Sequence, residues 1–427
     1  MGEKRKNQSD VGSSRQNALS VLFSDEGQSV VVYKNKSLKK AIISHLDAVE
    51  SSTINDLARE LNISVPKTAS LVNEMIEEKI IQDNGKINSK GGRKASIYAL
   101  VSDACFFIGV DVKRFHVNIG LLNFRKQLVS IRERIPYELA NTQDSLNELI
   151  RIIREFIREF PQYQHKILGV GLNLSGRVNH LTGYSYSFFH FQEEPLSNII
   201  QQAIGIPTFL ENDSRSMAYG EFMNGVVKHE RNVLFINVDF GLGMGILIDG
   251  HLYYGKSGFS GEFGHIPFFN NEVICHCGKK GCLETETSGI ALLHIIREKI
   301  RKGSSSILSQ QFANPDDIRL EDIIAAAHKE DTLVIESLAE IGEKIGKALA
   351  ILINIFNPEL VVLGGLVSET GDFLRLPVRS ALNKYSLGLV NADTQLKTSK
   401  LGARAGVLGG CLIARGKLME KKEQGHG

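Results

Sequence analysis

Apolar residues recur at helical spacing in three successive segments that begin near Ser37. Steps of three and four residues place the apolar side chains of each segment on one face, so we expect three helices here. Thr53 is a predicted N-cap of the second helix and Ser64 of the third, because a side-chain oxygen at this position accepts a free backbone N–H. Residues 1–36 are mostly polar, and we expect them to form a mobile tail with at most one short ordered piece.

A β-hairpin is predicted directly after the third helix. Short strand-like runs flank Asn84-Gly85, and Asn-Gly is a strong signal for a tight hairpin turn. Three short helices followed by a hairpin indicate a winged helix-turn-helix, so residues 37–100 are a predicted DNA-binding domain. Its third helix would enter the major groove, and its basic wing would meet phosphates. The predicted DNA contacts are Lys67, Thr68, Ser70, Asn73, Lys86, Lys90, Arg93 and Lys94. A helical protein-interaction domain with a solvated charged face would produce a similar pattern.

After residue 100 the pattern changes to alternating strands and helices. Each half of this region opens with two strands around a turn and continues with strand-helix alternation, which predicts two similar α/β lobes with a cleft between them. A glycine-rich turn is expected at 240–245. We assign residues 101–415 to this two-lobed domain and 416–427 to a frayed tail. Strands are expected at 106–112, 117–122, 167–174, 208–210, 232–239, 245–249 and 360–363, and helices at 142–160, 214–223, 290–300, 320–327 and 332–356.

Length, charge and cysteine use limit the classes of protein. A chain of 427 residues suggests about two or three domains. Its 50 basic and 48 acidic residues give a net charge of +2, so any surface for nucleic acid must be local. Five cysteines at these positions do not resemble a disulfide framework and favour a reducing compartment. The N-terminus lacks the apolar core of a signal peptide, and no apolar run approaches the ~20 residues of a membrane span. We therefore expect a soluble, cytoplasmic protein.

The segment from Gly261 to Glu284 concentrates residues that bind metals. It contains one histidine and three cysteines, and Zn²⁺ accepts thiolate and imidazole ligands in a closed tetrahedral site. Gly278 and Gly281 allow the chain to turn back between the last two cysteines. The predicted ligands of a structural zinc are His265, Cys275, Cys277 and Cys282. Inert buried cysteines beside a core histidine are the alternative, and the density of ligands favours zinc.

Asp213 lies at the end of a predicted strand, with Asn212 beside it. Ligands bind at such strand ends in α/β folds. A carboxylate here could accept hydrogen bonds from sugar hydroxyls, or it could remove a hydroxyl proton in phosphoryl transfer. The alternative is that Asn212 or Asp213 only caps the following helix. Glu262, His265 and Glu284 add the carboxylates and imidazole that a ring of sugar hydroxyls would need.

The segments GEFGH, CHCGKKGCLE, ENDSR and SGRV together resemble the ROK family of repressors, open reading frames and kinases. The resemblance extends from about Ser37 to Leu412, and the N-terminal unit ending in GGRKASIYAL is similar to the regulator branch. It implies a two-lobed actin-like, hexokinase-like (ribonuclease H-like) α/β domain behind an N-terminal winged helix-turn-helix. It also implies that the histidine and three cysteines hold a structural zinc, and that Asp213 matches the catalytic aspartate of the kinases. The implied sugar contacts are Gly176, Asn212, Asp213, Glu262, His265 and Glu284.

One segment departs from the kinases of this family. They carry an Asp-x-Gly-Gly-Thr loop whose backbone approaches the ATP phosphates, whereas this chain reads Asp111-Val112-Lys113-Arg114-Phe115. Because bulky side chains occupy that turn, we expect no catalysis, although Asp213 would be the general base of a kinase.

The leading hypothesis is therefore a sugar-responsive transcriptional regulator that binds operator DNA as a homodimer or homotetramer. An ATP-dependent sugar kinase with an appended domain is the alternative. A third hypothesis replaces the sugar with a partner protein that docks on the zinc lobe.

Overall fold

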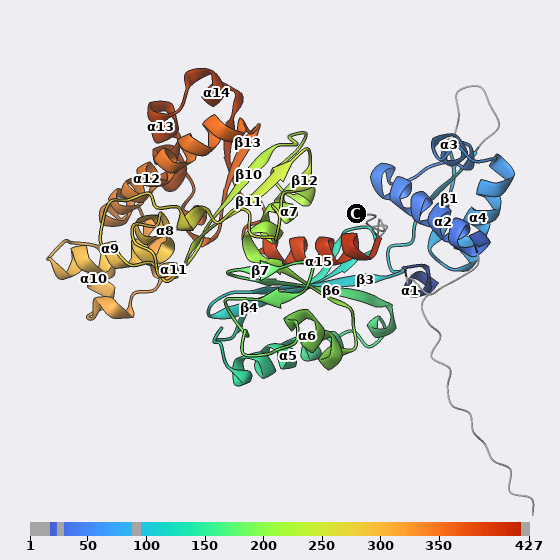
Figure 1. Cartoon of the computed structure of the whole chain (residues 1–427), viewed down its shortest axis with the longest axis horizontal. Coiled ribbons are helices and arrows are strands. Elements are labelled where there is room, and N and C mark those ends of the chain that lie inside the picture. The colour runs from blue at the N-terminus through green and yellow to red at the C-terminus, as the bar shows by residue number, and fades with distance from the viewer. Residues whose placement is uncertain (1–17, 24–29, 88–94, 420–427) are drawn as a thin grey trace, which may run out of the picture.

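The computed structural model describes residues 18–23, 30–87 and 95–419. An N-terminal helical unit lies beside the first of two lobes, and each lobe is built on its own five-stranded sheet (Figure 1). The two similar α/β lobes predicted from the repeated hairpins are confirmed.

The N-terminal unit contains the predicted helices and a hairpin of two strands, but the turn predicted at Asn84-Gly85 is wrong. These two residues lie within β1, at an irregularity of its pairing with β2. The Asp56 backbone N–H donates to the Thr53 hydroxyl at 3.2 Å, which confirms the cap of the second predicted helix. Ser64 makes no such side-chain bond, although α4 begins at the expected residue. The elements are α1 Ala18–Phe23, α2 Val30–Val49, α3 Ile54–Glu60, α4 Val65–Glu77, β1 Ile81–Ile87 and β2 Ala95–Leu100.

The predicted tails are too long at both ends. Helix α2 begins at Val30, because the apolar run there continues the helix instead of standing alone. In α1, Leu19 and Leu22 are buried in the same core as the rest of the N-terminal unit. At the other end, the frayed tail was predicted to begin at residue 416, but helix α15 (Arg404–Met419) continues to Met419. Residues 1–17, 24–29 and 420–427 lie outside the described residues.

The two sheets have the same topology. Their strand orders are β5-β4-β3-β6-β9 and β12-β11-β10-β13-β14. In each sheet an antiparallel meander of three strands is followed by two parallel strands. The edge strand β5 was not predicted. None of its residues is fully buried and several are charged, so it lacks the apolar pattern of the inner strands. The strands are β3 Phe106–Val112, β4 His116–Asn123, β5 Leu128–Pro136, β6 Ile167–Leu174, β9 Thr208–Asn212, β10 Val233–Val238, β11 Leu242–Ile248, β12 His251–Leu252, β13 Leu360–Gly364 and β14 Gln395–Thr398.

The predicted glycine turn at 240–245 is mostly strand. Strand β11 begins at Leu242, so the turn is limited to Asp239–Gly241 and is closed by the Asp239 N–H bonded to the Gly241 carbonyl at 3.1 Å. Gly243 and Gly245 therefore lie in the strand, where they allow close packing against α7, and only Gly241 belongs to the turn.

Helices cover both sheets, and α7 (Asp213–Asn224) and α15 lie between the lobes (Figure 1). Helix α15 packs across β3, β4 and β6, and a side chain on Gly171 would collide with the Gly410 carbonyl. Small residues obscure its helical periodicity, so it was not predicted. The other lobe helices are α5 Gln143–Arg158, α6 Leu196–Ile204, α8 Glu284–Thr287, α9 Gly289–Arg301, α10 Ile307–Gln311, α11 Leu320–Ala327, α12 Thr332–Phe356, α13 Asp372–Tyr385 and α14 Gly388–Asp393.

One hydrophobic core joins the N-terminal unit to the first lobe. It contains Ile42 and Leu71 of the N-terminal unit, Phe107 of β3, and Leu408 and Leu412 of α15. Burial of such side chains stabilises by about 25 cal/mol per Å² of apolar surface. The N-terminal unit is therefore packed against the first lobe and is not merely tethered to it.

Candidate metal centre and ligand cleft

Four predicted metal ligands meet in the metal loop (residues 261–284). Ligand atoms of His265, Cys275, Cys277 and Cys282 all lie within 4.8 Å of one another. The Cys277 and Cys282 sulfurs are 3.6 Å apart, and the Cys275 sulfur is 3.6 Å from His265 Nδ1. A tetrahedral zinc with bonds of about 2.3 Å requires sulfur pairs about 3.8 Å apart. The four residues therefore form a cluster that could bind a metal, with spacings that suit zinc.

The cysteines of the cluster are free thiols. A disulfide needs sulfurs about 2.05 Å apart, which the cluster does not approach. Burial would raise the pKa of the Cys277 thiol, but hydrogen bonds from the Lys279 backbone and the neighbouring thiols outweigh it and lower that pKa. A lowered pKa favours the thiolate, which is the form that binds metals.

Glu284 connects the cluster to a histidine that the sequence analysis missed. Its Oε1 accepts a hydrogen bond from the Cys275 thiol at 2.9 Å and lies 2.9 Å from His276 Nδ1 and 3.5 Å from His265 Nδ1. The hydrogen bond to Glu284 raises the pKa of His276. His276 could have been found from its position between two ligating cysteines. Glu262 lies farther out, 3.8 Å from His265 Nε2.

The second group of predicted residues lies where β9 meets α7. The Asn212 side-chain N–H donates to the Gly176 carbonyl at 3.0 Å, and its Oδ1 accepts the Arg215 backbone N–H at 3.1 Å. Asp213 Oδ1 accepts the Ser214 backbone N–H at 2.7 Å. Asn212 therefore is the helix cap that was the alternative interpretation, and it also binds the loop after β6.

Strand β11 lies between the two groups. Gly243 lies against the side chain of Ser214, the neighbour of Asp213, while the carbonyl of Met244 lies against Gly261 at the start of the metal loop. Among the described residues, no hydrogen bond or ion pair joins the Asn212-Asp213 pair to the acidic and imidazole groups of the loop. The structure thus places the predicted ligand residues on either side of one strand.

The segment Asp111–Phe115 lies where the two lobes meet. Lys113 Nζ is 3.5 Å from Asp111 Oδ2 and 3.5 Å from Asp239 Oδ2. The Phe115 and Phe240 rings pack edge to face with centroids 5.3 Å apart. The turn after β3 and the turn after β10 are therefore joined by side chains.

One predicted DNA contact is wrong. Thr68 is fully buried, and its hydroxyl donates to the Ser64 carbonyl at 3.1 Å, so it faces the core. Val65 was expected in the core but is 46% exposed. The buried face of α4 therefore differs from the predicted one and includes Thr68. Ser70 and Asn73 are exposed, and Lys67 donates to Asn35 Oδ1 at 2.8 Å. Lys86 is exposed on β1, whereas Lys90, Arg93 and Lys94 lie outside the described residues.

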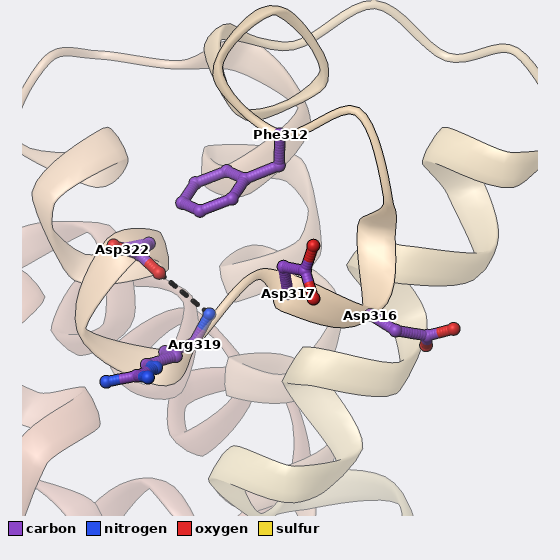
Figure 2. A pocket seen from close by; sticks show the side chains of 5 residues that line it. All are labelled: Phe312, Asp316, Asp317, Arg319 and Asp322. Atoms are coloured by element: carbon purple, nitrogen blue, oxygen red, sulfur yellow. Dashed lines mark hydrogen bonds between the residues drawn. The ribbon is translucent and has the colours of Figure 1, made fainter.

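A hollow in the second lobe contains none of the predicted residues. Phe312 and four charged residues line it, and the Arg319 N–H donates to Asp322 Oδ2 at 2.8 Å (Figure 2). This bond caps the start of α11, and the carboxylate of Asp316 pairs with Arg301. The carboxylates of Asp316 and Asp322 are thus engaged in local structure at the surface.

The duplicated sheets, the buried helices between them and the polar strand ends define a two-lobed α/β protein of the hexokinase-like type. The sequence model of the ROK family matches residues 107–417, and the chain belongs to that family.

Similar proteins include both regulators and kinases. The chain is 30% identical to a xylose repressor of Caldicellulosiruptor bescii, over 83% of this chain and 89% of that protein. It is also 30% identical to a glucokinase of Halalkalibacterium halodurans, over 71% of this chain and 93% of that protein. A solved ROK family transcriptional regulator, a homolog of the E. coli MLC protein, is 27% identical with a TM-score of 0.72 and covers 86% of this chain and 92% of its own.

No helix in the described part of the chain is long and apolar enough to span a bilayer.

We predict that Cys277→Ser abolishes zinc binding, because a neutral hydroxyl is a poor substitute for a thiolate ligand. The purified wild-type chain should contain about one zinc per chain by elemental analysis, and the variant close to none. Its melting temperature should also fall, since metal bound only to the native state stabilises it.

Cys105→Ala is the matched control, because Cys105 is fully buried and outside the cluster. It should keep its zinc even if it is less stable. Full zinc occupancy in Cys277→Ser would disprove the ligand set.

Proposed function

We propose that this protein is a sugar-responsive transcriptional repressor. The observation that carries the proposal is the extent of the similarity: the match to the xylose repressor covers 83% of the chain, against 71% for the glucokinase. The longer match reaches beyond the two lobes, into the unit that carries α2, α3, α4 and a hairpin. That unit has the arrangement of a winged helix-turn-helix.

The N-terminal unit is the proposed operator-binding domain, with α4 in the major groove. Its exposed Ser70 and Asn73 are suited to base edges, and Lys67 to the groove or a phosphate. Lys86, Lys90, Arg93 and Lys94 are the proposed phosphate contacts of the wing. We place the domain boundary near residue 100, where β2 ends.

The two-lobed domain is the proposed sensor of a sugar or sugar derivative. The proposed contacts are Gly176, Asn212, Asp213, Glu262, His265 and Glu284. A structural zinc on the four-residue cluster would supply no chemistry. It would fix the loop that carries Glu284, whose carboxylate lies among the ligands.

Helix α15 supports a mechanism for coupling the two sites. Near its start, the Gly406 carbonyl accepts hydrogen bonds from Asn173 of β6 at 2.6 Å and from Ser216 of α7 at 3.3 Å. Near its end, the guanidinium of Arg415 binds both carboxylate oxygens of Asp47 on α2, at 2.7 and 3.1 Å. A lobe movement that shifts α15 would therefore also move the N-terminal unit, which provides the differential contacts that allostery requires.

A kinase activity is the second candidate, and Asp213 at the strand end favours it. Against it, the side chains of Lys113 and Phe115 span the two turns between which a triphosphate would have to lie. Close approach of backbone N–H groups to phosphates needs a turn free of such side chains. We propose that the chain does not use ATP.

A homodimer or homotetramer in the cytoplasm completes the proposal, since two-fold symmetric operators are read by paired domains.

Asn73→Ala should weaken operator binding, because a contact to a base edge contributes about 1–3 kcal/mol of discrimination. The measurement is a titration of full-length protein against its operator, isolated by selection from genomic fragments. Asn147→Ala, an exposed substitution on α5, is the control and should bind as wild type does. Unchanged affinity in Asn73→Ala would remove Asn73 from the reading face of α4.

Asp47→Asn should loosen the attachment of the N-terminal unit. It leaves the guanidinium of Arg415, a residue only 6% exposed, without its carboxylate partner, which we expect to cost about 1–3 kcal/mol. Chemical denaturation measures this loss. The control is Asp372→Asn, which breaks an exposed pair within one helix and should cost under about 1 kcal/mol. Equal stability of both variants would count against the Arg415–Asp47 contact.

Wild-type protein should form no ADP from ATP with any member of a panel of hexoses, pentoses and amino sugars. The same panel in a thermal-shift assay should contain a sugar that raises the melting temperature, because ligand bound to the native state stabilises it. Sugar-dependent ADP formation that is lost in Asp213→Asn would establish the kinase alternative instead.

A further inference from the structure

Lys113 lies at the point where the two lobes approach each other. It follows directly after β3 of the first sheet, and its ammonium is 3.5 Å from Asp111 of the same strand. The same ammonium is 3.5 Å from Asp239, which follows β10 of the second sheet. It also lies 3.5 Å from the Met217 sulfur on α7. One side chain thus touches both lobes and the helix between them.

Asp111 depends on this ammonium. The residue is fully buried, and neither carboxylate oxygen has a hydrogen-bond partner among the described residues. The contact with Lys113 at 3.5 Å is an ion pair. Burial raises the pKa of Asp111 to about 6; Lys113 opposes the rise, and the charges of Asp213 and Asp239 add to it. An unpaired buried carboxylate is costly, so the Lys113 charge is needed here.

Close packing prevents Asp111 from finding another partner. Gly406 of α15 lies directly against its carboxylate, and a side chain at that position would overlap it. Water therefore has little room on that side. On the cleft side, the negative charges of Asp213 and Asp239 act on the same ammonium. Two carboxylates, from β3 and from the turn after β10, thus lie 3.5 Å from one positive charge, and the charge of Asp213 on α7 adds to their effect.

We propose that the Lys113 ammonium is a built-in cation that ties the two lobes together and occupies a position that a divalent cation would otherwise fill. Carboxylate oxygens are the ligands that Mg²⁺ and Mn²⁺ prefer. A lysine supplies a compact point charge on a flexible stem, and as part of the chain it cannot dissociate. The tie favours one spacing of the lobes in the absence of nucleotide or metal, and a ligand that moves the lobes must work against it.

Two neighbouring contacts support a tie between lobes at this place. Phe115, two residues after Lys113, packs on Phe240, the residue after Asp239. Farther out, Arg134 of β5 lies 3.6 Å from Glu321 of α11 in the other lobe. Both contacts of Lys113 and Arg134 pair opposite charges, and the Lys113 contact is the more buried of the two.

The test is the full-length variant Lys113→Met, which removes the charge and keeps most of the volume. Mn²⁺ binding, followed by electron paramagnetic resonance on zinc-loaded protein, should show about one added site per chain. The dissociation constant of this variant for Mn²⁺ should be at least about tenfold lower than that of the wild-type protein. Mn²⁺ or Mg²⁺ should also raise the melting temperature of this variant and leave that of wild type unchanged at matched ionic strength.

Three further variants make the result specific. Lys329→Met, an exposed lysine on the second lobe, should behave as wild type. Lys113→Arg keeps the charge and should gain no Mn²⁺ site. The double variant Lys113→Met/Asp239→Asn should lose the site gained by Lys113→Met, because one of the carboxylates is gone.

Asp239→Asn keeps the proposal testable if Lys113→Met fails to fold. It leaves Lys113 beside Asp111 and removes only the ion pair of Lys113 with the second lobe. This variant should therefore fold and should melt about 1–4 °C below wild type. A wild-type melting temperature in Asp239→Asn would overturn the tie. A folded Lys113→Met without an added Mn²⁺ site, or a wild type that binds Mn²⁺ equally well, would overturn the cation assignment.

Discussion

The close packing of α15 is the constraint on which the rest of the structure depends. This helix can lie on β3, β4 and β6 only because glycines let backbone meet backbone at Gly171 and Gly410, and because Gly406 leaves room for the buried carboxylate of Asp111. Its other end shares a core with the N-terminal unit and holds Asp47 through Arg415. One helix therefore contacts both the strands and helix between the lobes and the proposed DNA-binding unit. A displacement of either of them would displace the other.

Two polar clusters lie in the lobes around this helix. In the second lobe one histidine and three cysteines form a cluster that could bind a metal, and Glu284 faces both His276 and this cluster. Between the lobes, Lys113 balances carboxylates that belong to separate elements. Both devices keep polar groups in place without a nucleotide. A protein that senses a small molecule needs such a preorganised cleft more than it needs a phosphate loop.

Much of this architecture could be predicted from the sequence, because hydrophobic periodicity is a local property. The inner strands of both sheets and the helices α5, α11 and α12 lie within a few residues of their predicted bounds, whereas the edge strands β5, β12 and β14 were not predicted. Long-range packing could not be predicted in the same way. Helix α15 is rich in glycine and alanine, so its buried faces carry little periodic signal, and the exposed Val65 shifts the buried face of α4 away from the one expected.

The candidate site was predictable to a similar degree. Short spacing brought the four metal-cluster residues together, whereas the contact of Lys113 with Asp239 joins residues far apart in the chain and appears only in three dimensions. The central claim is that a sugar changes how this protein binds DNA. The most direct measurement is the affinity of the full-length protein for genomic fragments, with and without the sugar that raises its melting temperature. We predict that the protein binds a specific fragment tightly and that the sugar weakens this binding. Indifference of operator binding to every sugar that stabilises the protein would contradict the account.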